Sequence, residues 1–239
     1  MKILRFLLGM IFSLSLMFIV LVSSIEIAAY SDYSFYQKEY DKYAVTEFVG
    51  ISKEDLMKVT VDMMNYLKGE RETLSDINAK IKGVDNTPFF NEREIAHMKD
   101  VRTLFITAIF LRKLLLAVCI LCIALVKFTK GSLRKFLSNT FIFGTLGIII
   151  PSVLTVFLIL SDFEKYFIIF HHIFFNNDLW ILDPATDNLI NIVPQGFFMD
   201  MAIRIFIIFS GITAMVIIIG AILKIFQNKS APTGLLTQH

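Results

Sequence analysis

VRTLFITAIFLRKLLLAVCILCIALVKFTKGSLRKFLSNTFIFGTLGIIIPSVLTVFLILS, residues 101–161, is the stretch that decides the fold. It contains two apolar runs, 104–126 and 136–160, which are separated by a short basic loop. Each run exceeds the roughly 18 residues that a helix needs to cross the hydrocarbon core of a bilayer. None of the 21 acidic residues of the chain falls in this stretch. The sequence therefore predicts two membrane-spanning helices joined by a basic loop.

Two further apolar runs flank this stretch, from Phe6 to Tyr30 and from Met201 to Phe226. Each is again long enough to span a bilayer. Hydrophobic residues make up 56% of the chain, which is atypical of a soluble domain of this length. We therefore predict an all-α integral membrane protein with four transmembrane helices. A cleaved signal peptide is the alternative for the first run, but its apolar region is longer than that of a typical signal.

The distribution of charge predicts which side of the membrane each connection faces. Clusters of basic residues without acidic neighbours occur near both ends and in the central loop: Lys2, Arg5, Lys127, Lys130, Arg134, Lys135, Lys224 and Lys229. Such clusters favour the cytoplasmic side. Apart from Glu26, the acidic residues lie between positions 32 and 100 and between positions 162 and 200. We expect these two segments on the extracytoplasmic side.

These features divide the chain into eight expected segments. The transmembrane helices are 1–30, 104–126, 136–160 and 201–226. The outer segments are a small extracytoplasmic cap, 31–103, and an aromatic loop, 161–200. The inner segments are the basic loop, 127–135, and the cytoplasmic tail, 227–239.

The cap contains signals for two helices. Ser52 is expected to cap a helix that ends near Gly69 and packs through Leu56, Val59, Met63 and Leu67. Asn91, with Glu94 three residues later, is expected to cap a helix that continues unbroken into the second span. Residues 83–88 between them have the composition of a turn.

His97 is the first candidate catalytic residue. Its ordinary pKa near neutrality allows an imidazole to take or give a proton. Glu94 and Asp100 lie about one turn away on either side, where a carboxylate can hold one ring nitrogen. At 1.5 Å per residue, His97 would stand roughly 10 Å above Leu104, the first residue expected in lipid. A structural role is the alternative for a lone helical histidine.

The aromatic loop contains the second candidate, in the pair His171-His172. Adjacent side chains point in different directions, so at most one of them should join His97. Zinc could bind His97 and His171 with Asp178 or Asp183, but the chain has no H-E-x-x-H or comparable spacing. We predict neither a metal nor another cofactor. Nucleic acid is excluded as a partner because no basic patch lies outside the membrane.

The spans contain a few residues that stand out. Arg112 lies roughly eight residues, or about 12 Å, inside the second span. A cation at that depth usually lines a polar cavity or contacts a partner, with snorkelling as the alternative. Cys119 and Cys122 are interpreted as packing residues, because their neighbours are apolar. Gly144 and Gly147 are expected to allow close packing of the third span.

Two stretches resemble the signatures of a known family. They are NEREIAHMKDV, residues 91–101, and FHHIFFNNDLWILDPATD, residues 170–187. Both are similar to signatures of the bacterial lipoprotein intramolecular transacylases, which are small membrane proteins of Gram-positive bacteria. The four-span layout is also similar, over nearly the whole chain. The resemblance implies that His97 and His171 are the catalytic histidines, whereas His172 lies outside the pattern.

The resemblance also implies a reaction. The family acts on diacylglyceryl lipoproteins at the outer surface of the cell membrane. It moves the sn-2 acyl chain of the glycerol to the α-amino group of the lipidated N-terminal cysteine, giving a lyso-form lipoprotein. No cofactor is implied, and the partners are the lipoprotein and membrane lipid. Beside the resemblance, we expect from the residues themselves that Glu94, Asp100, Asp178 and Asp183 support or orient the histidines, and that Arg112 and Trp180 are candidates for contact with the substrate or the oxyanion.

Two other functions compete with this interpretation. The first is a non-enzymatic membrane receptor or assembly factor that uses the outer cap, and it predicts that both histidines tolerate substitution. The second is a zinc-dependent membrane hydrolase, and it predicts stoichiometric zinc in the purified protein.

Overall fold

The computed structural model describes residues 1–229, so most of the expected tail 227–239 lies outside the described residues. Within this range, the helices long and apolar enough to cross a membrane are Lys2–Tyr30, Glu92–Phe128, Leu133–Ser161 and Gln195–Gln227. The chain divides into two compact units. The first unit comprises residues 1–24, 111–156 and 207 onward, and the second comprises residues 25–110 and 157–206.

The first unit consists of long apolar helices. It contains most of α1 (Lys2–Tyr30), the later part of α5 (Glu92–Phe128), most of α7 (Thr145–Ser161) and the later part of α10 (Gln195–Lys229). The short helix α6 (Leu133–Asn139) and the π-helical turn η1 (Thr140–Gly144) lead directly into α7. Helix α5 continues unbroken from the cap into the span, as the sequence predicted.

Two cysteines and a glycine contribute to the packing of the first unit. Cys119 and Cys122 are buried and free, in a cluster with Phe12 and Phe136, which confirms their interpretation as packing residues. At Gly144, an added Cβ would collide with the side chain of Ser13, so this glycine does permit a close helix contact. The same expectation was wrong for Gly147, because no atom of another described segment would lie within 4 Å of a Cβ there.

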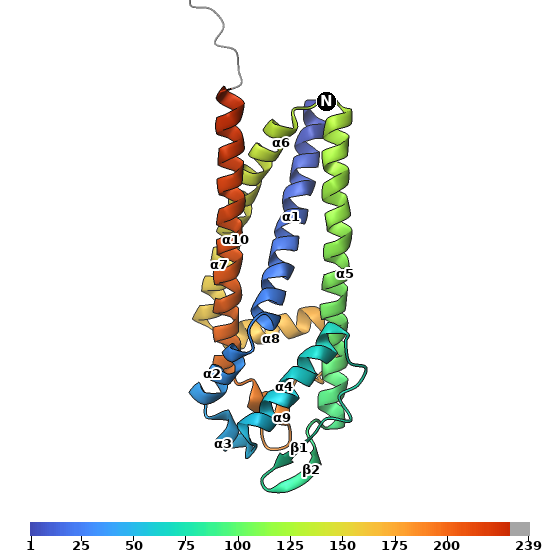
Figure 1. Ribbon diagram of the computed structural model, residues 1–239, viewed down its shortest axis with the longest axis vertical. Coiled ribbons are helices and arrows are strands. Elements are labelled where there is room, and N and C mark those ends of the chain that lie inside the picture. The colour runs from blue at the N-terminus through green and yellow to red at the C-terminus, as the bar shows by residue number, and fades with distance from the viewer. Residues whose placement is uncertain (230–239) are drawn as a thin grey trace, which may run out of the picture. The chain divides into compact units, whose positions relative to one another are not determined.

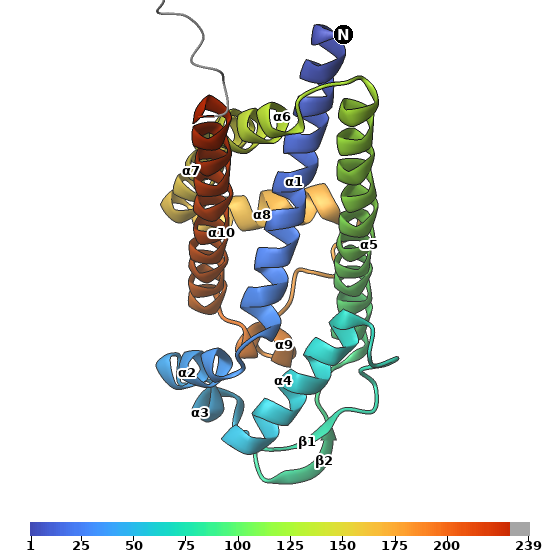
Figure 2. The ribbon, with the colours of Figure 1, turned by 45° about the horizontal axis from the view of Figure 1, so that its top comes forward.

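The second unit contains short helices and a hairpin. Its complete elements are α2 (Ser34–Lys42), α3 (Val45–Val49), α4 (Lys53–Lys68), β1 (Asn78–Ile81), β2 (Val84–Pro88), α8 (Phe163–Phe174) and α9 (Asn188–Ile192). Helix α3 packs against α9, and α4 packs against β1 (Figures 1 and 2). The first turns of α5 and α10 also belong to this unit.

Helix α4 forms as its sequence predicted. The Ser52 hydroxyl accepts a hydrogen bond from the backbone N–H of Asp55, and Gly69 ends the helix with φ of 88°. Its predicted packing face is buried in the core of the second unit: Leu56, Val59, Met63 and Leu67. That core also receives Tyr40 from α2 and Phe197 from α10. Apolar periodicity was sufficient here because one face of the helix is buried and the other faces water.

A β-hairpin is the feature that an all-α prediction omits. Strands β1 and β2 pair antiparallel, with Ile81 opposite Val84. The loop between them is Lys82-Gly83, whose φ values of 50° and 84° are both positive, as in a type I′ turn. The predicted turn over 83–88 was therefore only partly right, because residues from Val84 onward form a strand. The fold remains mostly helical.

Candidate functional site

The two candidate histidines come together within the second unit. His97 lies in the second turn of α5, and His171 lies in the last turn of α8. Their ring centroids are 6.1 Å apart, with an angle of 35° between the ring planes. Each side chain is only 7% exposed. A small reacting group between these rings would have an imidazole within reach on each side.

Helix α8 presents His171 on its buried face. Most of the helix is apolar, and its exposed residues include Ile168, Ile169, Phe170, Ile173 and Phe174. A helix with such a face lies naturally at the boundary between lipid and water. Asp162 caps its start by accepting a hydrogen bond from the backbone N–H of Lys165. His171 therefore lies between an apolar helix surface and the interior of the unit.

One hydrogen bond defines the tautomer of His171. Its Nδ1 lies 2.7 Å from the carbonyl oxygen of Phe167, and only an N–H can donate to that carbonyl. In the neutral ring the proton is therefore on Nδ1, which leaves the lone pair on Nε2. Burial lowers the pKa of His171 below its ordinary value of 6.5, and nearby His172 lowers it too, while the bond to Phe167 opposes the shift. His171 is thus a neutral base at neutral pH.

Aromatic rings surround this base. The ring of Phe167 lies 4.1 Å from that of His171, and the ring of Trp180 stacks on it at 4.7 Å. Phe175 contacts both histidines, with centroid distances of 5.4 Å to His97 and 5.6 Å to His171. Because these rings exclude water, electrostatic interactions are stronger here than at an exposed site.

Two buried nitrogen atoms at this site have no hydrogen-bond partner among the described residues. They are Nδ1 of His97 and Nε1 of Trp180. Buried polar groups are normally satisfied, and a buried group left without a partner costs about 1–3 kcal/mol. The site therefore has unused hydrogen-bonding capacity next to the base.

A buried capping box positions the turn that carries His97. Asn91 Oδ1 accepts from the backbone N–H of Glu94 at 3.0 Å, and Glu94 Oε2 accepts from the backbone N–H of Asn91 at 2.7 Å. Glu94 Oε1 also accepts from the backbone N–H of Leu189, in α9. The predicted cap is confirmed, and the carboxylate of Glu94 binds backbone groups of α5 and α9. It does not hold the unpartnered Nδ1 of His97.

Asp187 is a residue that the sequence did not single out for the site. It is 3% exposed, and its carboxylate accepts from Asn91 Nδ2 at 2.7 Å and from the backbone N–H of Asp183 at 2.7 Å. It thereby ties the aromatic loop to the start of α5. The turn-forming residues between Asp183 and Asp187 were the available signal, but they do not reveal the partner in α5.

The other predicted supporting residues act on the loop. Asp100 accepts a hydrogen bond from Asn177 Nδ2 at 2.9 Å. Asp178 is exposed, and its backbone carbonyl accepts from Arg93 at 2.9 Å. Asp183 is also exposed, and its carboxylate accepts from the backbone N–H of Ala185 at 2.9 Å.

Arg112 and His172 have surroundings different from those of the histidine pair. Arg112 belongs to the first unit, where it donates to the Ser23 hydroxyl at 3.4 Å.

His172 is exposed, and its ring meets the indole of Trp180 edge-on at 5.3 Å. Trp180 thus contacts the rings of both adjacent histidines.

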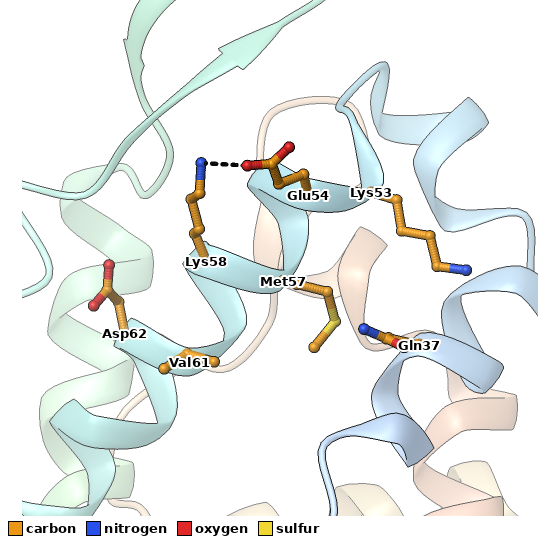
Figure 3. A pocket seen from close by; sticks show the side chains of 7 residues that line it. All are labelled: Gln37, Lys53, Glu54, Met57, Lys58, Val61 and Asp62. Carbon is orange, nitrogen blue, oxygen red and sulfur yellow. Dashed lines mark ion pairs between the residues drawn. The ribbon is translucent and has the colours of Figure 1, made fainter.

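A separate hollow lies on the surface of α4. Its volume is about 680 Å³, and it is lined by Gln37, Lys53, Glu54, Met57, Lys58, Val61 and Asp62 (Figure 3). Lys58 and Glu54 form an ion pair of 3.0 Å across one side of it. Neither candidate histidine lines the hollow, and its charged groups are largely solvated. The rings of His97 and His171 are instead buried side by side, so the histidine pair is the candidate site.

Among the described residues, the histidine pair is not joined by further metal-ligating side chains. Within residues 1–229, no three His, Cys, Asp or Glu side chains gather in a way that would hold a metal ion. The zinc hydrolase alternative therefore has no ligand set in the described part of the chain.

Comparison with known families identifies this chain. The model of the lipoprotein intramolecular transacylase family, Lit, matches residues 10–198, a range that includes both histidines. The chain belongs to the lipoprotein intramolecular transacylase family. Members of the Lit family are acyltransferases, so the protein is an enzyme of that class. This finding removes the alternative of a non-enzymatic receptor or assembly factor.

Solved structures of Lit from Bacillus cereus have a similar fold. One has 20% sequence identity and a TM-score of 0.73, and the match covers 96% of this chain and 100% of that chain. A variant with one histidine replaced by alanine gives a TM-score of 0.75 at 20% identity, over 95% of this chain and 96% of that chain. These matches support a mostly helical, multi-pass membrane protein with the Lit fold. A search of curated proteins gave no match.

Proposed function

We propose that the protein acts on diacylglyceryl lipoproteins and moves the sn-2 acyl chain of the glycerol to the α-amino group of the lipidated N-terminal cysteine. The product would be a lyso-form lipoprotein. The observation that carries the proposal is the buried pair of imidazoles, 6.1 Å apart, in a chain of the transacylase family. This arrangement suits a reaction in which protons must leave one atom and reach another.

The reaction requires a defined movement of protons. The attacking group begins as an ammonium ion and ends as an amide N–H, so its nitrogen loses two protons. One N–C bond forms at the acyl carbon, and the C–O bond to the glycerol breaks. The glycerol oxygen takes one proton and solvent takes the other. General acid–base groups on both sides of the acyl carbon typically accelerate such steps by about 10²–10⁴-fold.

His171 is our candidate for the base. Its Nδ1–H donates to the Phe167 carbonyl, so Nε2 has the lone pair that accepts a proton from the attacking nitrogen. Burial keeps the pKa of this ring low, which supports a neutral base at neutral pH. Once protonated, the imidazolium can return a proton to the reacting centre.

His97 is our candidate for the group that serves the leaving oxygen. Its ring faces that of His171 across 6.1 Å, and its buried Nδ1 has no partner among the described residues. A ring in this position can pass a proton to the glycerol oxygen as the C–O bond breaks. The capping box of Asn91 and Glu94 holds the turn that carries His97.

The substrate contributes much of the rate itself. The donor ester and the acceptor amine belong to one molecule, and orientation of such groups can supply about 7–11 kcal/mol. The aromatic rings around His171 would exclude the water that competes for the ester. The exposed apolar face of α8 supports a site at the membrane surface, where lipoprotein acyl chains enter the bilayer.

The charge pattern supports a location for this site. Acid-free basic clusters at Lys2 and Arg5 and in the loop 127–135 favour the cytoplasm. Both termini would then be cytoplasmic, and the histidine pair would lie at the outer leaflet of the bacterial cell membrane. Labelling of single cysteines introduced at exposed positions of α4 and of the loop 127–135, in intact cells, tests this orientation. Labelling of the loop by an impermeant reagent would contradict it.

The direct test uses a purified diacylglyceryl lipopeptide with the enzyme in detergent or nanodiscs. The acyl chain moves within one molecule, so the total mass stays the same and fragmentation by tandem mass spectrometry must locate it. We expect the acyl group on the N-terminal amine. An acyl group that remains on the glycerol after incubation with the folded enzyme would overturn the proposal.

Histidine variants test the roles of the pair. His171→Ala and His97→Ala should each reduce transfer by at least about 10²-fold. His172→Ala is the matched control, because its ring is exposed and adjacent in sequence. If either member of the pair tolerates alanine as well as position 172 does, that residue is not part of the mechanism.

A further inference from the structure

We propose that the indole N–H of Trp180 donates the hydrogen bond that stabilises the oxyanion on the migrating acyl group. This inference rests on the proposed transacylation. It gives Trp180 a catalytic role that complements the two histidines, because neither proton transfer by itself stabilises the negative oxygen of the tetrahedral intermediate.

The first observation is an unused donor. Nε1 of Trp180 is buried and has no acceptor among the described residues. An indole N–H is a donor only, so it cannot be satisfied by another donor. A buried donor without an acceptor is costly in a folded protein and requires an explanation. An acceptor that arrives with the substrate supplies one.

The second observation is the position of the ring. The indole stacks on His171, with centroids 4.7 Å apart and 28° between the planes. The acceptor for the indole N–H must therefore lie beside the imidazole that we assign as base. A carbonyl oxygen on the acyl carbon meets this requirement, because the attacking nitrogen on the same carbon must reach His171.

The third observation is that the loop before Trp180 is held at several points. Asn177 donates through Nδ2 to Asp100 at 2.9 Å and accepts through Oδ1 from the backbone N–H of Leu179 at 3.1 Å. Arg93 donates to the backbone carbonyl of Asp178 at 2.9 Å. A donor whose position is set in advance stabilises a developing charge without the cost of reorganisation.

The basic residues at the start of α5 are directed to other groups or exposed, although Nε of Arg102 has no partner among the described residues. Arg93 binds the Asp178 carbonyl, as above, and Arg102 stacks on Tyr66 at 4.6 Å and donates to the backbone carbonyl of Glu72 at 3.2 Å. Lys99 is exposed. A neutral indole N–H is also compatible with a neutral base, because it does not introduce a cation beside His171.

The test removes the N–H while the ring stays in place. The chain has a single tryptophan, so a tryptophan analogue incorporated during expression changes this position alone. Benzothienylalanine replaces the N–H by sulfur in a ring of nearly the same shape. Trp180→Phe is the genetic equivalent and retains an aromatic ring against His171.

We expect both changes to reduce kcat by about 10²–10³-fold, the size found when one oxyanion donor is removed. KM should change little, and the pH–rate profile should keep its shape because an indole does not titrate near neutrality. Tyr166→Phe is the control: it removes an aromatic hydroxyl donor from the same helix as His171. Thermal unfolding in detergent verifies that each protein is folded.

Transfer by the benzothienyl enzyme within about threefold of the unmodified enzyme would overturn the inference. If in that case His171→Ala still abolishes transfer, the proposed transacylation stands and only the role of Trp180 fails. If the unmodified enzyme itself leaves the acyl group on glycerol, the proposed function fails, and the role of Trp180 fails with it.

Discussion

Helices α4 and α5 begin with similar caps that have different surroundings. At α4, exposed Ser52 accepts from the backbone N–H of Asp55 and donates to its carboxylate, so both bonds stay within the cap. At α5, Glu94 is only 1% exposed and binds backbone groups of both α5 and α9. The same local pattern therefore starts a helix in one place and also joins two distant segments beside the histidines in the other.

The largest difference should appear when the buried cap is removed. Glu94→Ala leaves two backbone N–H groups without their acceptor, the part-buried one of Asn91 and the buried one of Leu189. We expect the free energy of unfolding to fall by about 2–4 kcal/mol. Transfer should also fall, because the turn carrying His97 loses its connection to α9. Unfolding in a detergent–denaturant series and the lipopeptide assay measure the two effects.

A small effect at Glu94 would contradict the distinction between the caps. Glu94→Gln tests the cause of the effect. Glutamine keeps one oxygen acceptor but places an amide N–H₂ against the other backbone donor. If hydrogen bonding is the cause, the Glu94→Gln variant should lose less free energy of unfolding than the Glu94→Ala variant. Equal losses for the two variants would point instead to the charge of the carboxylate.

Asp187→Asn should have the next largest effect. The two carboxylate oxygens accept separately from Asn91 and from Asp183, so replacing one oxygen by an amide N–H₂ removes one of these two bonds. We expect a loss of about 1–2 kcal/mol in the free energy of unfolding. Asp183→Asn is the control, since its exposed side chain needs only one oxygen for Ala185. Similar losses in the two variants would show that burial is not what distinguishes Asp187.

A pH dependence should originate in the buried region. Burial lowers the pKa of His171, so the folded protein releases this proton at a pH where the unfolded chain still holds it. Between the lowered pKa and 6.5, stability from this group therefore rises with pH, and it is lost as pH falls through that window. The rate should also fall on the acid side, at a midpoint below 6.5, because Nε2 becomes protonated.

Profiles of rate and unfolding between pH 4 and 8, roughly the range of histidine titration, measure this effect. NMR of a sample labelled with ¹³C at the histidine rings assigns the midpoint to His171. A midpoint at or above the ordinary value would contradict the burial argument. His172→Ala should leave an acid limb, shifted slightly upward, because it removes one neighbour that lowers the pKa of His171.

The smallest effect should come from the exposed cap. Ser52→Ala removes the acceptor for the backbone N–H of Asp55, which water can replace. We expect a loss of about 1 kcal/mol or less in the free energy of unfolding and no change in transfer. Ser52→Asn, which restores a capping oxygen, should recover most of that loss. A change in transfer with Ser52→Ala would mean that α4 is coupled to the site.

Local signals in the sequence predicted much of the fold. Long apolar runs predicted the membrane helices, and caps and periodicity predicted α4 and the start of α5, because these depend on neighbours within a few residues. The hairpin was missed because its strands are short and largely exposed. A run of four or five residues with little burial has no periodic pattern to detect.

The candidate site was predictable only in part. His97 and His171 could be named from residue chemistry and from a resemblance to a family. Glu94 was expected near His97, but its actual partners include a backbone group in α9. Asp187 was missed because its hydrogen bonds join segments distant in sequence. Contacts of this kind leave no spacing rule in the sequence.

The sequence by itself determined that this chain is a membrane protein with apolar spans, a continuous α5 and titratable residues outside the spans. Those properties follow from composition and from interactions between near neighbours. Only the tertiary structure decided that the rings of His97 and His171 lie close together, that Phe167 sets the tautomer of His171, and that the Trp180 N–H has no acceptor among the described residues. The physical reason is that burial and long-range hydrogen bonds depend on which segments meet in space.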